Sequence, residues 1–207
     1  MRTDLPPLNP RIAKLPIGPN GYPVPFFVAD PNDFRIADPE KIKRCINERI
    51  CWVCGQPLGI YMAFVIGPMC IVNRISGDPP SHLDCSVWSC KACPFLARPK
   101  MVRREDEVTE EMDKHTPGIM IKRNPGVMAI WVTKSYKLQP DNHGMLFHIG
   151  NPESIQWWRE GRYATRAEIE ESIESGLPSL REHCYTEEDH KALMSATREA
   201  MRLLPAR

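Results

Sequence analysis

Two pairs of metal-ligating side chains stand at regular spacing in the first half of the chain. Cys51 and Cys54 are separated by two residues and followed by Gly55, and His82 and Cys85 repeat this spacing further on. Two cysteines so spaced fit a tight backbone knuckle, for which glycine supplies conformational freedom. Three thiolates and one imidazole form a tetrahedral ligand set that zinc favours. We therefore predict one structural Zn²⁺ ion bound by Cys51, Cys54, His82 and Cys85.

The second pair of ligands has a competitor in Cys90 and Cys93, which are also separated by two residues. Asp78 followed by two prolines predicts a helix start, which places His82 and Cys85 together on one face of an early helical turn. The later cysteines fall further along the same helix, in a poorer position to reach the knuckle. We favour His82 with Cys85 and keep Cys90 with Cys93 as the alternative pair.

The ligand set also bears on whether the metal is catalytic. A catalytic zinc keeps one position open for water or substrate, whereas this chain has cysteine ligands to spare. In zinc deaminases a His-x-Glu motif precedes Pro-Cys-x-x-Cys, but here the cysteine pair comes before His82. We expect a protein without enzymatic activity, and keep a divergent metal-dependent nuclease as a weaker alternative.

The order of the elements around the ligands resembles that of a treble-clef zinc finger. Two apolar segments, residues 60–66 and 70–75, flank Gly67-Pro68 and predict a hairpin between the knuckle and the helix. Knuckle, hairpin and helix follow one another in that class, here over about residues 48–96. Treble-clef nucleases carry catalytic histidines or asparagines on the hairpin and helix, and this hairpin has no histidine.

Three segments, residues 51–55, 64–70 and 157–168, are similar to segments of uncharacterised bacterial and phage zinc-binding proteins. They read Cys-Trp-Val-Cys-Gly, Phe-Val-Ile-Gly-Pro-Met-Cys and Trp-Trp-Arg-Glu-Gly-Arg-Tyr-Ala-Thr-Arg-Ala-Glu. The resemblance implies a bacterial or phage origin and no particular activity.

The pattern of the whole chain predicts an α+β fold in three regions. Residues 1–97 form a zinc-stapled region with a proline-rich N-terminal arm, residues 98–116 a charged linker or loop, and residues 117–207 a strand pair followed by helices. Cys45 and Cys70 are expected in the core. The predicted strands are 26–29, 34–37, 127–133 and 145–149, with 134–139 extending the third; the predicted helices are Asp38 to about Arg49, 152–160, and two that begin at capping boxes of Thr165 and Thr186.

Charge is distributed unevenly along the chain. Residues 1–104 carry 14 Lys/Arg and 8 Asp/Glu, a net charge of +6, whereas residues 105–207 carry 13 and 18, a net charge of −5. A basic half can attract phosphate, although ordinary solvated surface explains the same excess. We therefore predict a nucleic-acid-associated accessory protein, with a protein-interaction module that docks on a larger complex as the alternative.

Two clusters are the candidates for contact with such a partner. The first is a basic run, and the second joins aromatic rings to guanidinium groups, which can stack on bases and bind phosphates. In the simpler interpretation of the second cluster, one tryptophan is in the core and the arginines are solvated. The candidate contact residues are Arg98, Lys100, Arg103, Arg104, Trp158, Arg159 and Arg162.

Hydropathy gives no indication of a membrane protein. No stretch approaches the ~20 uninterrupted apolar residues that cross a bilayer, and the proline-rich N-terminus does not read as a signal peptide. We expect a cytoplasmic protein. In that reducing compartment, clustered cysteines are more often metal ligands than disulfides.

Overall fold

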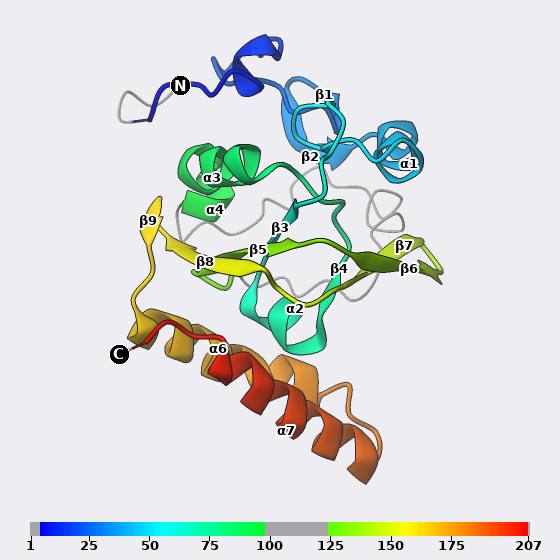
Figure 1. The fold of residues 1–207 in the computed structure, drawn as a ribbon, viewed down its shortest axis with the longest axis vertical. Coiled ribbons are helices and arrows are strands. Elements are labelled where there is room, and N and C mark those ends of the chain that lie inside the picture. Colours follow the sequence, from blue (N-terminus) through cyan, green and yellow to red (C-terminus); the bar gives the residue numbers. More distant parts are fainter. Residues whose placement is uncertain (1–4, 98–123, 207) are drawn as a thin grey trace.

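The computed structural model describes residues 5–97 and 124–206 of the chain (Figure 1). Helices and strands are mixed along both ranges, which confirms the α+β class. The first range contains η1 (Ile12–Lys14), β1 (Val28–Asp30), β2 (Asp33–Ala37), α1 (Pro39–Asn47), β3 (Met62–Ile66), α2 (Pro68–Asn73), β4 (Ile75–Ser76), α3 (Leu83–Ala92) and α4 (Pro94–Ala97). The second contains β5 (Met128–Thr133), β6 (Tyr136–Asp141), β7 (Gly144–Ile149), β8 (Ser154–Arg159), β9 (Arg162–Tyr163), α6 (Arg166–Arg181) and α7 (Glu187–Arg202).

A four-stranded antiparallel sheet with the order β3-β5-β8-β9 lies in the middle of the structure. Its ladder pairs Phe64 of β3 with Trp131 of β5, and Trp131 in turn with Ile155 of β8. A second sheet has the order β4-β7-β6, and β1 and β2 form a separate hairpin. Because β3 and β4 come from the first range and their partners β5 and β7 from the second, the two halves of the sequence share both larger sheets.

One face of the four-stranded sheet carries the main hydrophobic core. Phe64, Trp131 and Trp157 pack there with Ile169 and Ile173 of α6, and each of these side chains is at most 4% exposed. The helices α2, α6 and α7 contact one another and lie together on this side (Figure 1). Burial of a large apolar side chain contributes roughly 1.5–3 kcal/mol, so this layer is held mainly by apolar packing.

The opposite face of the sheet packs against α3. Ala63, Ile130 and Trp158 form a smaller buried cluster there with Cys90 of α3. Trp157 and Trp158 therefore lie on opposite faces, as neighbouring residues of a strand must. Both tryptophans are core residues, where the simpler sequence interpretation placed only one.

The hairpin predicted for residues 60–75 is wrong in its second half. The first segment forms β3 as expected, but Pro68 occupies the first turn of α2 after the N-cap Gly67. Met69 and Val72 are buried in the main core, one turn apart. An apolar, β-branched run suits a buried helix as well as a strand, and β3 instead pairs with the distant β5.

The helix predicted for residues 152–160 is also wrong, because this segment is β8. Glu160 and Gly161 have positive φ angles of 53° and 74°, and Arg159 pairs with Arg162 across them. Two positive φ values in a two-residue loop define the tight turn of a β-hairpin, which joins β8 to β9. Residues 134–139 likewise do not extend β5, since β6 turns back and pairs with β7.

Local capping signals in the sequence are confirmed. The side chain of Asp38 accepts hydrogen bonds from the first turn of α1, and Cys45 of that helix is 1% exposed. Thr165 and Thr186 form capping boxes at the starts of α6 and α7. Within the two described ranges, none of the helices is both long enough and apolar enough to span a bilayer.

Candidate metal centre

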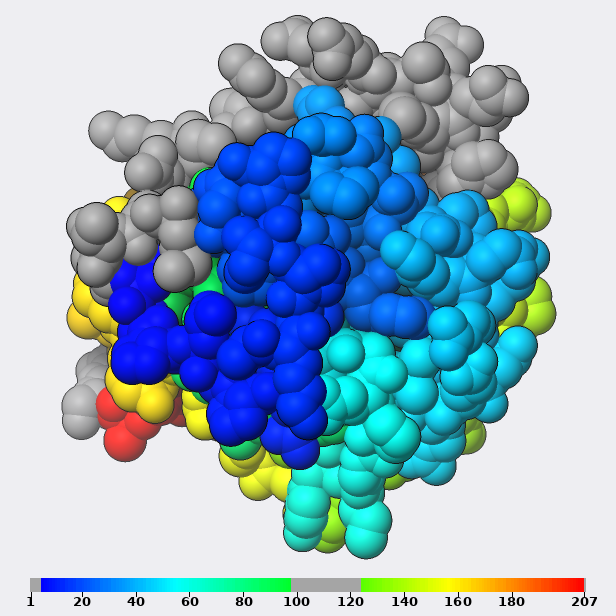
Figure 2. Space-filling model, turned by 90° about the horizontal axis from the view of Figure 1, so that it is seen from above, coloured from blue at the N-terminus to red at the C-terminus, as the bar shows by residue number. Residues whose placement is uncertain are grey.

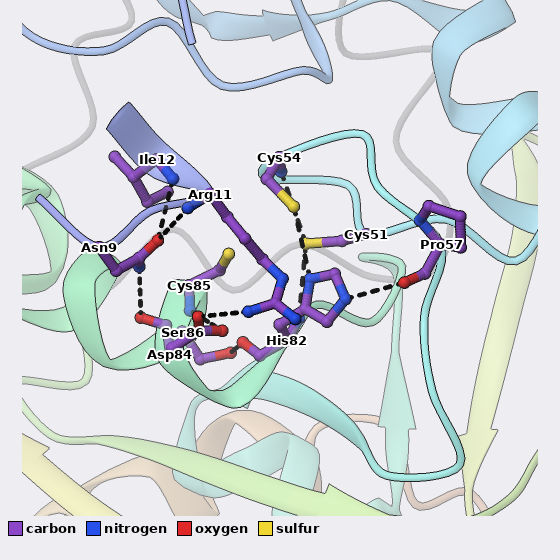
Figure 3. Close-up of polar contacts among 10 residues, drawn as sticks. All are labelled: Asn9, Arg11, Ile12, Cys51, Cys54, Pro57, His82, Asp84, Cys85 and Ser86. Atoms are coloured by element: carbon purple, nitrogen blue, oxygen red, sulfur yellow. Dashed lines mark hydrogen bonds and ion pairs between the residues drawn. The ribbon is translucent and has the colours of Figure 1, made fainter. Parts of the chain in front are cut away.

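The first ligand pair lies on a tight turn that its own backbone stabilises (Figure 3). The N–H of Cys51 donates to the carbonyl of Gln56 at 2.8 Å, and the N–H of Gly55 donates to the carbonyl of Cys51 at 2.7 Å. The N–H of Cys54 points at the sulfur of Cys51 at 3.5 Å. Gly55 has a φ of 69°, and a Cβ there would lie 2.7 Å from the ring of Phe26, so both conformation and packing require glycine.

The second ligand pair lies where the chain enters α3. His82 is the N-cap residue and Cys85 is in the first turn, so the helix begins at Leu83. The helix start expected directly after Asp78 is therefore wrong, and Ser81, just before the N-cap, instead forms an isolated bridge with Ala63. His82 and Cys85 still face the same way, since an N-cap and the third helical residue lie about one turn apart.

The edge of the central sheet positions this entry. Ser81 and Ala63 of β3 exchange two backbone hydrogen bonds of 2.8 Å. The hydroxyl of Ser81 also lies 2.6 Å from that of Ser86, which donates to the carbonyl of His82 at 3.0 Å. Both serines are fully buried, and each hydroxyl has two hydrogen-bonding partners within the protein. The ligand His82 is thus connected through a polar network to the sheet.

The structure brings the ligand atoms of Cys51, Cys54, His82 and Cys85 within 4.8 Å of one another, and all four residues are buried. His82 Nδ1 lies 3.4 Å from Cys54 Sγ. A tetrahedral shell with zinc–sulfur bonds of ~2.3 Å and zinc–nitrogen bonds of ~2.0–2.1 Å separates its ligand atoms by about 3.5–3.8 Å. The cluster therefore needs only small adjustments to hold a metal ion.

The orientation of His82 also suits metal binding. Its Nε2 lies 2.9 Å from the carbonyl oxygen of Pro57, which can only accept a hydrogen bond. Nε2 therefore carries a proton, and Nδ1 faces the cysteine sulfurs (Figure 3), where its lone pair can bind a metal ion once its own proton is lost. Such a contact behind a metal-binding imidazole selects the tautomer and fixes the ring.

The thiols and the imidazole shift one another's pKa values strongly. Hydrogen bonds from the thiols of Cys51 and Cys85 hold the pKa of Cys54 far below its usual range. The same interactions, with Cys51 first and Cys54 second, raise the pKa of Cys85 far above its usual range. Hydrogen bonding to Cys51 raises the pKa of His82 to about 10. A thiolate in the cluster therefore makes deprotonation of the next thiol less favourable. A divalent cation removes this penalty, because it stabilises the deprotonated form of every ligand.

The N-terminal arm, residues 5–24, covers the centre from outside. Ile12 is fully buried in a cluster that also contains Cys51, Cys54 and Cys85. Seen from above, the arm and the elements that follow it spread over this face of the molecule (Figure 2). The sequence predicted a proline-rich arm on the surface, and the structure adds that the arm inserts an apolar side chain beside the ligands.

Polar contacts of the arm meet at Asp84, which lies between the two ligands of the second pair. Arg11 Nη1 lies 2.8 Å from Asp84 Oδ2, and Asn9 Nδ2 donates to the Asp84 carbonyl at 3.2 Å. Asn9 Oδ1 accepts from the N–H groups of Arg11 and Ile12 at 3.0 and 2.9 Å and so fixes the turn (Figure 3). Sequence reasoning missed these residues, and the only local signal was Asn9 as a turn-former.

The alternative ligand pair is not part of this cluster. Cys90 is 1% exposed and packs between α3 and the sheet, with Trp158 among its neighbours. Burial raises the pKa of its thiol to about 12. Cys93 is the C-cap residue of α3, at the end of the helix away from Cys85. Among the described residues, only Cys51, Cys54, His82 and Cys85 gather closely enough to hold a metal ion.

Of the candidate contact residues, the structure describes Trp158, Arg159 and Arg162. Trp158 is only 5% exposed, so its ring is not open for stacking on a base. Arg162 donates to both oxygens of Glu168, at 3.0 and 2.7 Å, and Arg159 lies 3.4 Å from the same carboxylate. Tyr163, which sequence reasoning missed, packs on Trp158 and is 65% exposed. The basic run of Arg98, Lys100, Arg103 and Arg104 lies outside the described residues.

Comparisons with protein-family models, with curated proteins and with solved structures found no match. The geometry defines a buried Cys₃His cluster that can hold a metal ion and that joins the arm, the knuckle and α3.

Proposed function

We propose that this protein is a non-enzymatic binding protein whose Cys₃His cluster holds one structural Zn²⁺ ion. The observation that carries this proposal is the convergence of four buried ligand atoms within 4.8 Å. A tetrahedral set of sulfur and nitrogen ligands favours zinc among the common divalent ions. When bound, the ion neutralises the thiolates and links residues that are far apart in sequence.

A structural role follows from the completeness of the ligand set. Three thiolates and one imidazole fill a tetrahedron, so no position is left for water or substrate. The Nε2 atom of His82 is already hydrogen-bonded to the carbonyl oxygen of Pro57, and Cys51 and Cys85 are 0% exposed. The hairpin that would carry the catalytic groups of a treble-clef nuclease is replaced by β3 and α2. These features weigh against the nuclease alternative.

For the partner, we propose a protein rather than a nucleic acid. The described part of the aromatic and basic cluster is poorly suited to nucleic acid, because Trp158 is buried and Glu168 pairs with both arginines. The basic excess of residues 1–104 still favours a phosphate-rich partner, so nucleic-acid association stays as the second candidate. None of the eight cysteines, all of which are described, forms a disulfide, and we propose a reducing, cytoplasmic location.

X-ray absorption on the purified protein tests the metal assignment. We expect close to one equivalent of zinc in a shell of three sulfurs and one nitrogen, because His82 and not Cys90 or Cys93 completes the cluster. His82→Ala should loosen the ion, and Cys90→Ala should leave it bound. Protein with well under half an equivalent of any metal would contradict the proposal, and a shell of four sulfurs would contradict the role of His82.

Salt dependence tests the partner class. Binding to phosphates weakens steeply as salt rises, with a slope close to the number of phosphates contacted. We expect little affinity for single- or double-stranded nucleic acid at physiological salt. Tight binding that falls steeply with salt would instead establish the nucleic-acid candidate.

A further inference from the structure

We propose that the N-terminal arm is a metal-dependent clasp, which docks when the centre holds its ion and is released when the ion is lost. This inference rests on the structural zinc ion proposed above. The arm, residues 5–24, has little structure of its own: the three-residue η1 and one isolated bridge between Ile17 and Pro23. The backbone hydrogen bonds made by the amides of Ala13, Leu15 and Gly18 close local turns within the arm and do not attach it to the rest of the protein. A segment of such short local turns keeps one conformation only when side-chain contacts with other parts of the protein hold it.

The apolar attachment of the arm is made directly to the ligand residues. The cluster that buries Ile12 has seven buried members, and three of them are metal-ligating cysteines: Ile12, Cys51, Val53, Cys54, Cys85, Trp88 and Ala92. Leu8, which precedes η1 in the sequence, and Leu15, which follows it, pack against the same cluster. If the cysteines separate after loss of the ion, Ile12 loses part of the apolar packing that buries its side chain.

The polar attachment of the arm depends on the same turn of α3. Both Arg11 and Asn9 bind Asp84, through its carboxylate and its carbonyl. Asp84 lies between His82 and Cys85, and a metal ion bound by these two residues fixes the first turn of the helix. The Arg11–Asp84 pair is partly exposed, with side chains 41% and 38% accessible, so by itself it holds the arm weakly.

Coupling of this kind must act in both directions. If the bound ion increases the stability of arm docking by some factor, arm docking increases the affinity for the ion by the same factor. The outer side of the arm faces solvent (Figure 2), where Lys14 is exposed. In this view no described segment lies over the arm, and release of the arm exposes Ile12 with the neighbouring leucines.

Hydrogen exchange on the full chain, with zinc and after chelation, tests the clasp. Chelation should speed exchange at the hydrogen-bonded amides of Ala13, Leu15 and Gly18 by about tenfold or more. Peptides from β5 and α6 should change much less. Unchanged protection of the arm after zinc removal would overturn the proposal, and so would equal loss of protection over the whole chain.

Two variants separate the clasp from general destabilisation. Arg11→Gln removes the ion pair to Asp84 and should increase both arm exchange and the zinc dissociation constant by similar factors. Lys14→Gln removes an exposed charge of the same arm and should change neither. Faster arm exchange in Arg11→Gln with unaltered zinc affinity would overturn the coupling. Absence of zinc from the purified parent protein would instead count against the proposed function itself.

Discussion

The metal centre and the helical layer of this molecule are held together in different ways. Around the centre, the arm, the knuckle and the entry to α3 contain little regular structure, and cysteine ligands are a large part of the buried cluster. Beneath the sheet, α6 and α7 begin at capping boxes and bury a continuous set of aliphatic and aromatic side chains. Under the proposed function, the first region depends on a bound ion, whereas the second depends on apolar area and regular hydrogen bonding.

This contrast shows how a chain can fold a segment that lacks helix and strand signals. A proline-rich segment cannot form a ladder of backbone hydrogen bonds, so something else must compensate for its conformational entropy. The metal ion proposed between residues 51 and 85 would provide a large, local contribution without requiring a large apolar core. The two regions should therefore respond to different perturbations.

Removal of one ligand is expected to have the largest effect. Cys54→Ser should lose the ion and several kcal/mol of stability, since structural zinc contributes on the order of 10 kcal/mol in small peptides. Elemental analysis and thermal unfolding check this, with a fall in Tm of at least about 10 °C. Cys184→Ala, which changes a cysteine outside the cluster, should retain the metal. A Cys54→Ser protein with full zinc content and the parent Tm would contradict the claim that a metal ion stabilises this region.

A substitution in the main core should lower the stability of the protein without releasing the ion. Phe64→Ala removes a ring that is 1% exposed and should cost about 3–5 kcal/mol. The ion should remain bound below the unfolding transition, because Phe64 is not among the residues of the metal cluster. Urea unfolding together with zinc content distinguishes the two regions. Zinc release at urea concentrations well below the unfolding midpoint would show that the regions are not separate.

A smaller effect is expected at the knuckle backbone. Gly55→Ala places a side chain at a φ of 69° and 2.7 Å from the Phe26 ring, and should cost roughly 1–3 kcal/mol. Zinc affinity should fall as well, since Cys54 precedes the strained residue. Gly59→Ala is the matched control, because nothing lies within 4 Å of a Cβ at that position. Equal stability of the two variants would mean that the knuckle tolerates rearrangement.

The smallest effect concerns the start of α6. Hydrogen bonds from Arg162 lower the pKa of Glu168 to about 2, and the Thr165 backbone and hydroxyl add to this shift. A lowered carboxyl pKa gives stability that is present above the unfolded value near 4.5 and is lost as pH falls toward 2. Glu168→Gln should be less stable than the parent at pH 7, and the difference should vanish near pH 2 in urea titrations. Zinc content at pH 7 should stay the same.

Sequence reasoning succeeded where the decisive interaction is local. The N-cap Asp38 and the capping boxes of Thr165 and Thr186 involve residues at most three positions apart. The spacing of the ligands is equally local within each pair. The two pairs could be combined because a structural zinc ion requires four ligands. These features could be recognised without knowledge of the rest of the fold.

Sequence reasoning failed where contacts between distant parts of the chain determine the structure. The segment after Gly67 could be strand or helix by composition, and its burial under α6 and α7 selects the helix. The strand β8 forms because β5 lies beside it, despite the helix predicted there. The contact between Arg11 and Asp84 joins residues 73 positions apart, and no pattern in the sequence indicates such a pairing.

The pairing of β3 with β5 has a consequence for synthesis on the ribosome. Ile66 of β3 pairs with Ala129, so the central sheet cannot close until the second half of the chain has emerged. All four proposed metal ligands are present once Cys85 has left the exit tunnel, because chains emerge from their N-terminus. We therefore expect arrested nascent chains that end before β5 to capture zinc already, which radioactive zinc retained on the ribosome would reveal. The cell would then control the first step of folding through its supply of metal.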